Sequence, residues 1–225
     1  MRIDSMNARL NFENAKALLQ QNGLNPSAAR LTQSYIRSEI LINSTTAQYK
    51  LGVTVNQQNN AGTIYNTENR LALQDWFITS QIGVLLAAPS SSTDASYRLL
   101  SYPTTALFTT SGAAAAANTL YNGKLSLSID QNVVLPSWDI SRCYKAANTQ
   151  AASNADYTTS GINYIDAFDF SVDGFYPVEG NLIINGAANI DFTLNLPAAI
   201  ATVQSNSRIV VIQRGILAQN VTSVK

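Results

Sequence analysis

The 225-residue sequence has no histidine, a single cysteine and no glycine-rich nucleotide-binding or nucleophile motif. Without histidine, the chain alone cannot form a Ser-His-Asp triad, a Cys-His pair or the usual Cys/His zinc site. Cys143 has no partner for an internal disulfide. We therefore expect no enzymatic activity, no catalytic or metal-binding residue and no cofactor. With 14 acidic residues, the sequence does not exclude a pair of carboxylates for glycoside hydrolysis.

Charge is also scarce, at 12% of the residues against about 25% in an ordinary soluble domain. The 14 basic and 14 acidic side chains balance, so the basic excess that nucleic-acid binding requires is missing. No apolar run reaches the 18 or more residues of a membrane span. Asp4 interrupts the start of the chain, where a secretory signal would be apolar. We expect synthesis in a host cytoplasm without a signal peptide, no direct nucleic-acid binding and no membrane span.

Apolar and uncharged polar residues make up most of the chain. Hydrophobic residues account for 46%, and Ser, Thr, Asn and Gln together number 77. A chain of this length and apolar content can bury the core of one domain of ordinary size, or of one domain with an added arm.

The first 45 residues carry helical signals. Phe12, Ala15, Leu18 and Leu19 have helical spacing, and Asn22-Gly23 is a typical helix stop. Asn25-Pro26 then predicts the start of a second helix, which would carry Leu31, Tyr35 and Ile36. We expect an N-terminal helical arm over residues 1–45 and a β-sandwich domain over 46–225, although one continuous domain fits the sequence equally well.

After Gln48, short alternating or β-branched runs are separated by Asn, Gly, Ser, Pro and Asp clusters. This pattern predicts a mainly β fold, an antiparallel β-sandwich of jelly-roll-like type. In the clearest strand, 189–196, Ile190, Phe192 and Leu194 alternate with polar residues, and a short link suggests a hairpin with 181–185. Strands are predicted near 48–55, 76–87, 97–102, 124–130, 132–136, 163–172, 180–184, 189–196, 208–213 and 215–219.

Three aspartates, Asp166, Asp169 and Asp173, form the one acidic cluster. They could hold calcium, which takes oxygen ligands in flexible loops. The stronger interpretation is a solvent-facing strand surface, because Phe168 and Phe170 alternate with them as an inward face and Asp173-Gly174 is an ordinary turn signal.

Charges of opposite sign concentrate in different parts of the chain. Residues 1–50 carry six basic and three acidic side chains, whereas residues 146–207 carry six acidic and no basic ones. Complementary patches permit head-to-tail association of identical copies, although scatter over a solvated surface explains them too. Two aromatic residues beside turns, Trp138 and Tyr176, are candidates for exposure. The possible interface residues are Arg9, Lys16, Arg30, Arg37, Asp166, Asp169, Asp173, Trp138 and Tyr176.

Three segments, 118–145 (NTLYNGKLSLSIDQNVVLPSWDISRCYK), 181–197 (NLIINGAANIDFTLNLP) and 208–220 (RIVVIQRGILAQN), resemble structural proteins of bacteriophage particles. This resemblance implies a jelly-roll sandwich with an N-terminal arm, located in the virion as a capsid subunit or a capsid-associated protein. Its partners would be copies of itself and other virion structural proteins. The alternative is a carbohydrate-binding or adhesion module in which an exposed Trp138 or Tyr176 stacks on sugars.

Overall fold

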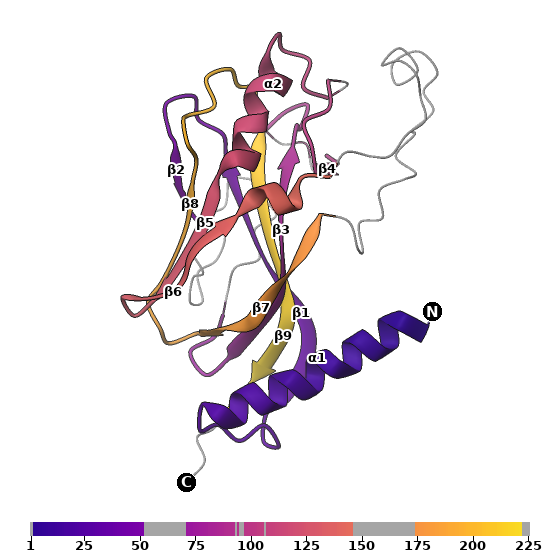
Figure 1. Ribbon diagram of the computed structural model, residues 1–225, viewed down its shortest axis with the longest axis vertical. Helices are drawn as coiled ribbons and strands as arrows, with labels where there is room; N and C mark the ends of the chain where they lie inside the picture. The colour runs from indigo at the N-terminus through magenta and orange to yellow at the C-terminus, as the bar shows by residue number, and fades with distance from the viewer. Residues whose placement is uncertain are drawn as a thin grey trace.

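Two antiparallel sheets pack face to face in the computed structural model, which describes residues 2–51, 71–92, 94, 97–105, 107–145 and 174–221, without the side chains of 2–10 and 179–181 (Figure 1). The first sheet has the order β1 (Arg30–Leu41), β9 (Arg208–Gln219), β3 (Trp76–Ala87), and the far edge of β3 pairs with both β7 (Phe175–Asn185) and β4 (Leu99–Leu100). The second has the order β2 (Gln48–Lys50), β8 (Ile190–Asn195), β5 (Lys124–Ile129), β6 (Asn132–Asp139). The predicted mainly β sandwich is confirmed.

Most connections between successive strands cross from one sheet to the other. The chain changes sheet between β1 and β2, β2 and β3, β4 and β5, β6 and β7, β7 and β8, and β8 and β9. This crossing rolls the two sheets together in the jelly-roll manner. The predicted hairpin of 181–185 with 189–196 is therefore wrong, because β7 pairs with β3 whereas β8 pairs with β2 and β5. Both strands bury one face in the same core, so alternation alone does not distinguish their sheets.

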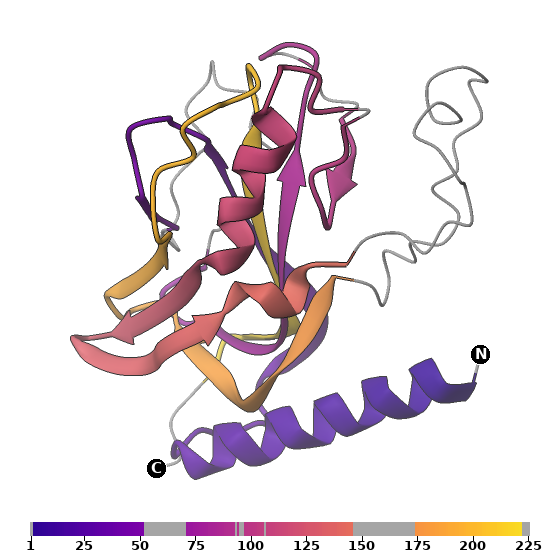
Figure 2. The same ribbon diagram turned by 45° about the horizontal axis from the view of Figure 1, so that its top comes forward.

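The two strands β5 and β6 do form a hairpin. Asp130 and Gln131 both have positive φ, 49° and 68°, as a two-residue turn of the hairpin type requires. The hairpin extends to one side of the sandwich (Figure 2). The strands predicted near 124–130 and 132–136 are thus confirmed.

The main core lies between the sheets and is closed at one end by the short helices α2 (Ala113–Ala117) and η1 (Asn118–Asn122). Phe192 and Leu194 of β8 are buried in it, as the alternation predicted. The strands predicted at 208–213 and 215–219 are one strand, β9, that continues through Gly215. The predicted strand 163–172 lies outside the described residues.

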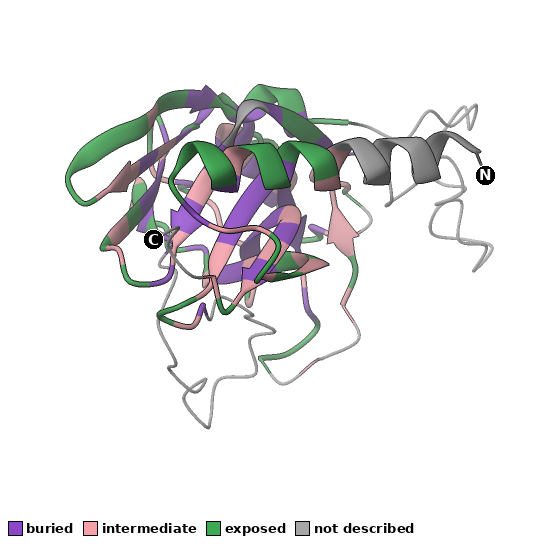
Figure 3. Ribbon diagram, turned by 90° about the horizontal axis from the view of Figure 1, so that it is seen from below, coloured by how far each residue is buried: buried purple, intermediate pink, exposed green. Residues whose placement is uncertain are grey.

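Helix α1 (Arg2–Gln21) packs across the first sheet and presents its other face to solvent (Figure 3). The predicted apolar face is confirmed, because Ala15 and Leu19 are buried against Ile78 and Ile216. After the helix, Gly23 has a φ of 71°, and the amides that follow bond back to Leu19 and Gln20. No helix within the described ranges is long and apolar enough to cross a membrane.

The predicted second helix is wrong, since Arg30–Leu41 forms strand β1 and pairs with β9 along all twelve residues. Asn25 does accept a bond from the amide of Ser27, but the turn ends after Ala29. Residues four apart, such as Leu31 and Tyr35, share a face in a strand as well as in a helix. The spacing therefore fits both a helix and a strand, and pairing with β9 makes residues 30–41 a strand of the first sheet.

Candidate functional site

The candidate site lies on the outer face of the first sheet, which faces away from the second sheet. On β9, residues 209 and 211 point into the core, so Arg208, Ile212 and Arg214 point outward. Register places outward side chains of β1, β9 and β3 in rows across the sheet. The row beneath α1 is Leu31–Ala218–Trp76. The rows at increasing distance from the helix are Gln33–Ile216–Ile78, Tyr35–Arg214–Gln81 and Arg37–Ile212–Gly83.

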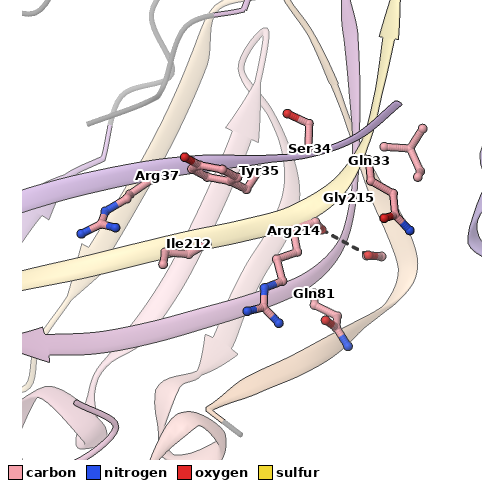
Figure 4. Close-up of a pocket in the computed structure, with 10 residues that line it drawn as sticks. Gln33, Ser34, Tyr35, Arg37, Gln81, Ile212, Arg214 and Gly215 are labelled. Atoms are coloured by element: carbon pink, nitrogen blue, oxygen red, sulfur yellow. Dashed lines mark hydrogen bonds between the residues drawn. The ribbon is translucent and has the colours of Figure 1, made fainter. Parts of the chain in front are cut away.

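A groove of about 560 Å³ opens over the last three of these rows (Figure 4). Helix α1 covers the sheet on one side of it, and Tyr97 and Leu99 cover Leu85 and Val210 on the other. The described residues that line the groove are Gln33, Ser34, Tyr35, Arg37, Ser80, Gln81, Ile212, Arg214, Gly215 and Ile216.

A β-bulge in β3 makes this region polar. The register between β3 and β9 shifts between Thr79 and Gln81, so that Ser80 is an extra residue. One extra residue exchanges the two faces of the strand beyond it. Gln81 consequently faces the groove, while Ile82, Val84 and Leu86 enter the main core. Ser80 Oγ donates to the carbonyl of Arg214 at 3.2 Å.

Arg37 is held in place by a carboxylate that has no exposed side-chain surface. The Nε of Arg37 donates to Glu39 Oε1 at 2.8 Å, and its Nη2 donates to the same oxygen and to the hydroxyl of Tyr97. That hydroxyl in turn donates to Glu39. The side chain of Arg37 is 19% exposed, so the buried carboxylate fixes this arginine at the wall of the groove.

The other oxygen of Glu39 bonds to a second, fully buried arginine. Arg208 Nη1 donates to Glu39 Oε2 at 3.3 Å, and its Nη2 donates to the carbonyl of Ser92 at 3.1 Å. The guanidinium also lies 5.1 Å from the ring centroid of Tyr97. The carboxylate of Glu39 on the edge strand β1 thus bonds to Arg208 of β9 and to Tyr97.

Arg214 is held by an aromatic ring. Its guanidinium lies 3.5 Å from the centroid of the Phe175 ring, at a distance typical of cation–π stacking. The ring itself lies against Gly83, where an added Cβ would be 2.8 Å from the Phe175 ring. The absence of a side chain at Gly83 therefore allows Phe175 to lie flat on the sheet beneath Arg214.

Among the predicted basic residues whose side chains the structure describes, Arg37 alone lines the groove. Lys16 is exposed on α1 and pairs with Glu13 at 3.2 Å, and Arg30 is exposed at the start of β1. The side chain of Arg9 and the residues Asp166, Asp169 and Asp173 lie outside the described part of the chain. Their predicted interface role and the calcium interpretation therefore stay predictions.

The two predicted aromatic contacts have different outcomes. Tyr176 is 43% exposed, in agreement with the expectation. The expected exposure of Trp138 is wrong, because it is 6% exposed and packs in the main core. Trp138 follows a run of exposed residues on the edge strand β6. It pairs with Leu125 of β5, and its side chain points into the core there.

Sequence reasoning did not identify Glu39, Arg208 or Arg214 as a group. A weak signal was present, because Arg208 and Arg214 are the only charges in the otherwise apolar run RIVVIQRGIL. A charge on a central strand needs a partner or an opening to solvent. Arg208 is paired with Glu39, and Arg214 lines the groove and stacks on the ring of Phe175.

The buried thiol of Cys143 gives a prediction about pH. Burial raises the pKa of Cys143 from 9.0 to about 12, while the carbonyl of Ile82 accepts from its Sγ at 3.8 Å. Because the folded pKa is raised, the contribution of this thiol to stability is complete below about pH 9 and is lost as pH rises through about 12. In this window we expect the unfolding free energy to fall by about 1.4 kcal/mol per pH unit from this group.

Urea unfolding of the wild type and of Cys143→Ala across that window would check this expectation. Burial also raises the pKa of Tyr121, so both proteins lose stability at high pH, and the difference between their slopes isolates the thiol. Equal slopes would contradict the assignment. The native protein should also react slowly with thiol reagents, since the thiolate is the reactive form.

Comparison of the chain with models of protein families, with curated proteins and with solved structures finds no match. Inference about function therefore depends on the residues and contacts described above.

Proposed function

We propose that the chain is a structural protein that assembles with copies of itself or with other proteins of a larger particle, a virus particle being the kind that the sequence resemblance suggests. The observation that carries this proposal is the β5–β6 hairpin, which extends from the sandwich (Figure 2). Apolar side chains near its turn are exposed. Val133 is 63% exposed and Val134 is 43% exposed.

The edge of β6 is built for contacts through side chains. Pro136 is exposed within the strand, and the pairing of β6 with β5 shifts register twice. Proline and irregular pairing on an edge strand oppose open-ended addition of further strands. An exposed apolar hairpin protected in this way favours docking into a defined site on a partner over fibre-like aggregation.

Fold and composition support the same proposal. Jelly-roll sandwiches occur in viral capsid proteins and in lectins, although a fold by itself does not determine function. The low charge content suits a chain that buries its surfaces against neighbours, because amides and hydroxyls pair across an interface at lower cost than unpaired charges. The alternative adhesion module loses one of its two anchors, since Trp138 is buried.

Replacing both hairpin valines with aspartate should prevent assembly and leave the fold intact. Both side chains are exposed, so we expect V133D/V134D to change the unfolding free energy by about 1 kcal/mol or less. Two charges at an apolar contact should weaken association at least tenfold. Sedimentation velocity over a concentration series, together with thermal unfolding, measures both effects.

The control is Ser137→Asp, which adds a charge to an exposed position of the same strand, away from the hairpin turn. It should assemble like the wild type. A wild-type protein that sediments as a monomer up to about 1 mM, and that also fails to join a particle when produced with its neighbouring gene products, would contradict the proposal.

A further inference from the structure

The outer edge of β1 is open to pairing with another strand. Strand β1 ends the first sheet, and within the described ranges β9 is its one partner strand. It contains no proline, and its register with β9 is unbroken over all twelve residues. Prolines and irregular pairing are two means by which edge strands oppose further pairing, and β6 has both. Strand β1 has neither, so its backbone presents a regular template to a further strand.

Exposure places the available part of this edge before Ile36. Arg30, Gln33 and Tyr35 are exposed, and Tyr35 has 52% of its surface accessible. Ile36 and Glu39 are buried, with 3% and 7% of their surfaces accessible. A partner strand therefore has access to the first half of β1, which is centred near Gln33.

A second copy of the same strand fits this half of β1. When two copies pair antiparallel about a two-fold axis at Gln33, Leu31 of one copy lies opposite Tyr35 of the other, and Thr32 lies opposite Ser34. Pairs of an apolar with an aromatic side chain, and of two hydroxyl side chains, stabilise antiparallel sheets. No like charges oppose each other in this register. The edge is thus self-complementary, as a two-fold interface requires.

Helix α1 extends beyond the same edge. Its C-terminal half packs on the sheet through Ala15 and Leu19, and Phe12 is the first described apolar side chain of the helix in this contact. The N-terminal half continues past β1 and away from the sandwich (Figures 1 and 2). Residues 2–11 span about 15 Å, at about 1.5 Å per residue. This length equals about three strand spacings of about 4.8 Å each.

The two-fold axis at Gln33 places this half of α1 over the groove of the second copy. The helix lies over the row that begins at Leu31, and the axis brings this row beside the row of Tyr35 in the other copy. The row of Tyr35 crosses β1, β9 and β3 in the groove, so its width matches the three strand spacings of the extended helix. Four residues along a strand separate the two rows by about 13 Å. Packed helices need about 8–10 Å between their axes, so both copies of α1 have space.

We propose that two copies of the chain pair edge to edge through the first half of β1, and that the N-terminal half of α1 from each copy covers the groove of the other. The second copy then completes the groove. The proposal goes beyond docking of the hairpin, because β1 and the groove belong to the first sheet and the hairpin to the second. Each pair would carry two hairpins, one from each copy, into a larger assembly.

Charges at Gln33 test the position of the axis, because the axis places the two copies of this residue opposite each other. Gln33 is exposed, so Q33E and Q33K should keep the fold. Each variant alone should dimerise at least tenfold more weakly than the wild type, since like charges then meet across the strands. An equimolar mixture of Q33E and Q33K should recover dimers, because opposite charges then meet. Sedimentation velocity of the full chain at low salt, up to about 1 mM, measures these affinities.

Ala8→Pro tests the contribution of the helix, because proline interrupts the N-terminal half of α1. The contacts of Phe12, Ala15 and Leu19 with the sheet should persist, so the urea midpoint should stay close to that of the wild type. The dimer should weaken at least tenfold, since the helix no longer follows a straight path over the groove. Dimerisation of Ala8→Pro with wild-type affinity would overturn the placement of the helix.

The matched control is Gln48→Glu, which adds a charge at an exposed residue on the edge strand of the second sheet and should dimerise like the wild type. V133D/V134D should lose assemblies larger than the dimer and keep the dimer, so failure of one proposal is distinguishable from failure of the other. A monomeric wild type at about 1 mM, unchanged affinity in Q33E, or no recovery in the mixture would overturn the pairing through β1.

Discussion

Replacing Glu39 with alanine should lower the unfolding free energy by about 3–5 kcal/mol, the usual cost of breaking a buried ion pair. Arg208 has no exposed surface, and its Nη1 would lose the carboxylate that stabilises its charge away from water. Arg37 and the Tyr97 hydroxyl would lose their acceptor as well. Urea unfolding at neutral pH gives the free energy for the variant and the wild type.

The expected loss of unfolding free energy comes from leaving the buried charge of Arg208 without its carboxylate, and not from the net contribution of the ion pair to stability. The double variant E39L/R208M should therefore recover much of the loss, since apolar replacement of a buried pair is often neutral or stabilising. Glu13→Ala is the control, because the Glu13–Lys16 pair is exposed and worth about 0.5 kcal/mol or less. A loss below about 1 kcal/mol in E39A would show that the cluster contributes little.

Sequence patterns predicted those elements whose buried face is visible in the spacing of their own apolar residues. The helical face of Ala15 and Leu19 and the alternation of Phe192 and Leu194 each describe one element against one core. Strand β1 escaped prediction because its helix-start signal at Asn25 is real but short, and a partner strand 167 to 189 residues away in the sequence overrode it. The sheet to which β7 belongs is likewise set by a distant partner.

The groove could not be predicted for the same reason. Arg37 was a candidate through its charge, but its neighbour Arg214 becomes visible only from the register of β1 on β9. The outward direction of Gln81 depends on the bulge at Ser80, which reverses the alternation of β3. Nothing in the sequence pairs Glu39 with Arg208, and both side chains are buried in the folded protein.

Gly215→Ala should lower the unfolding free energy by about 3 kcal/mol or more, because the new methyl group has no space. An added Cβ would lie 1.9 Å from the carbonyl oxygen of Ile78 and 3.0 Å from the Cα of Thr79. Both are backbone atoms of the paired strand, so no side-chain rotation relieves the overlap. Strands β3 and β9 would have to separate at the bulge that directs Gln81 and Arg214 into the groove.

Gly23→Ala is the matched control, since it adds the same methyl group in open space at a φ of 71°. It should cost only the left-handed backbone penalty, about 1–2 kcal/mol. Chemical denaturation measures both losses. If Gly215→Ala were no more destabilising than Gly23→Ala, the close approach of β3 and β9 at the bulge would be wrong. The placement of Arg214 beside Gln81 would then fail with it, because that placement depends on the same register.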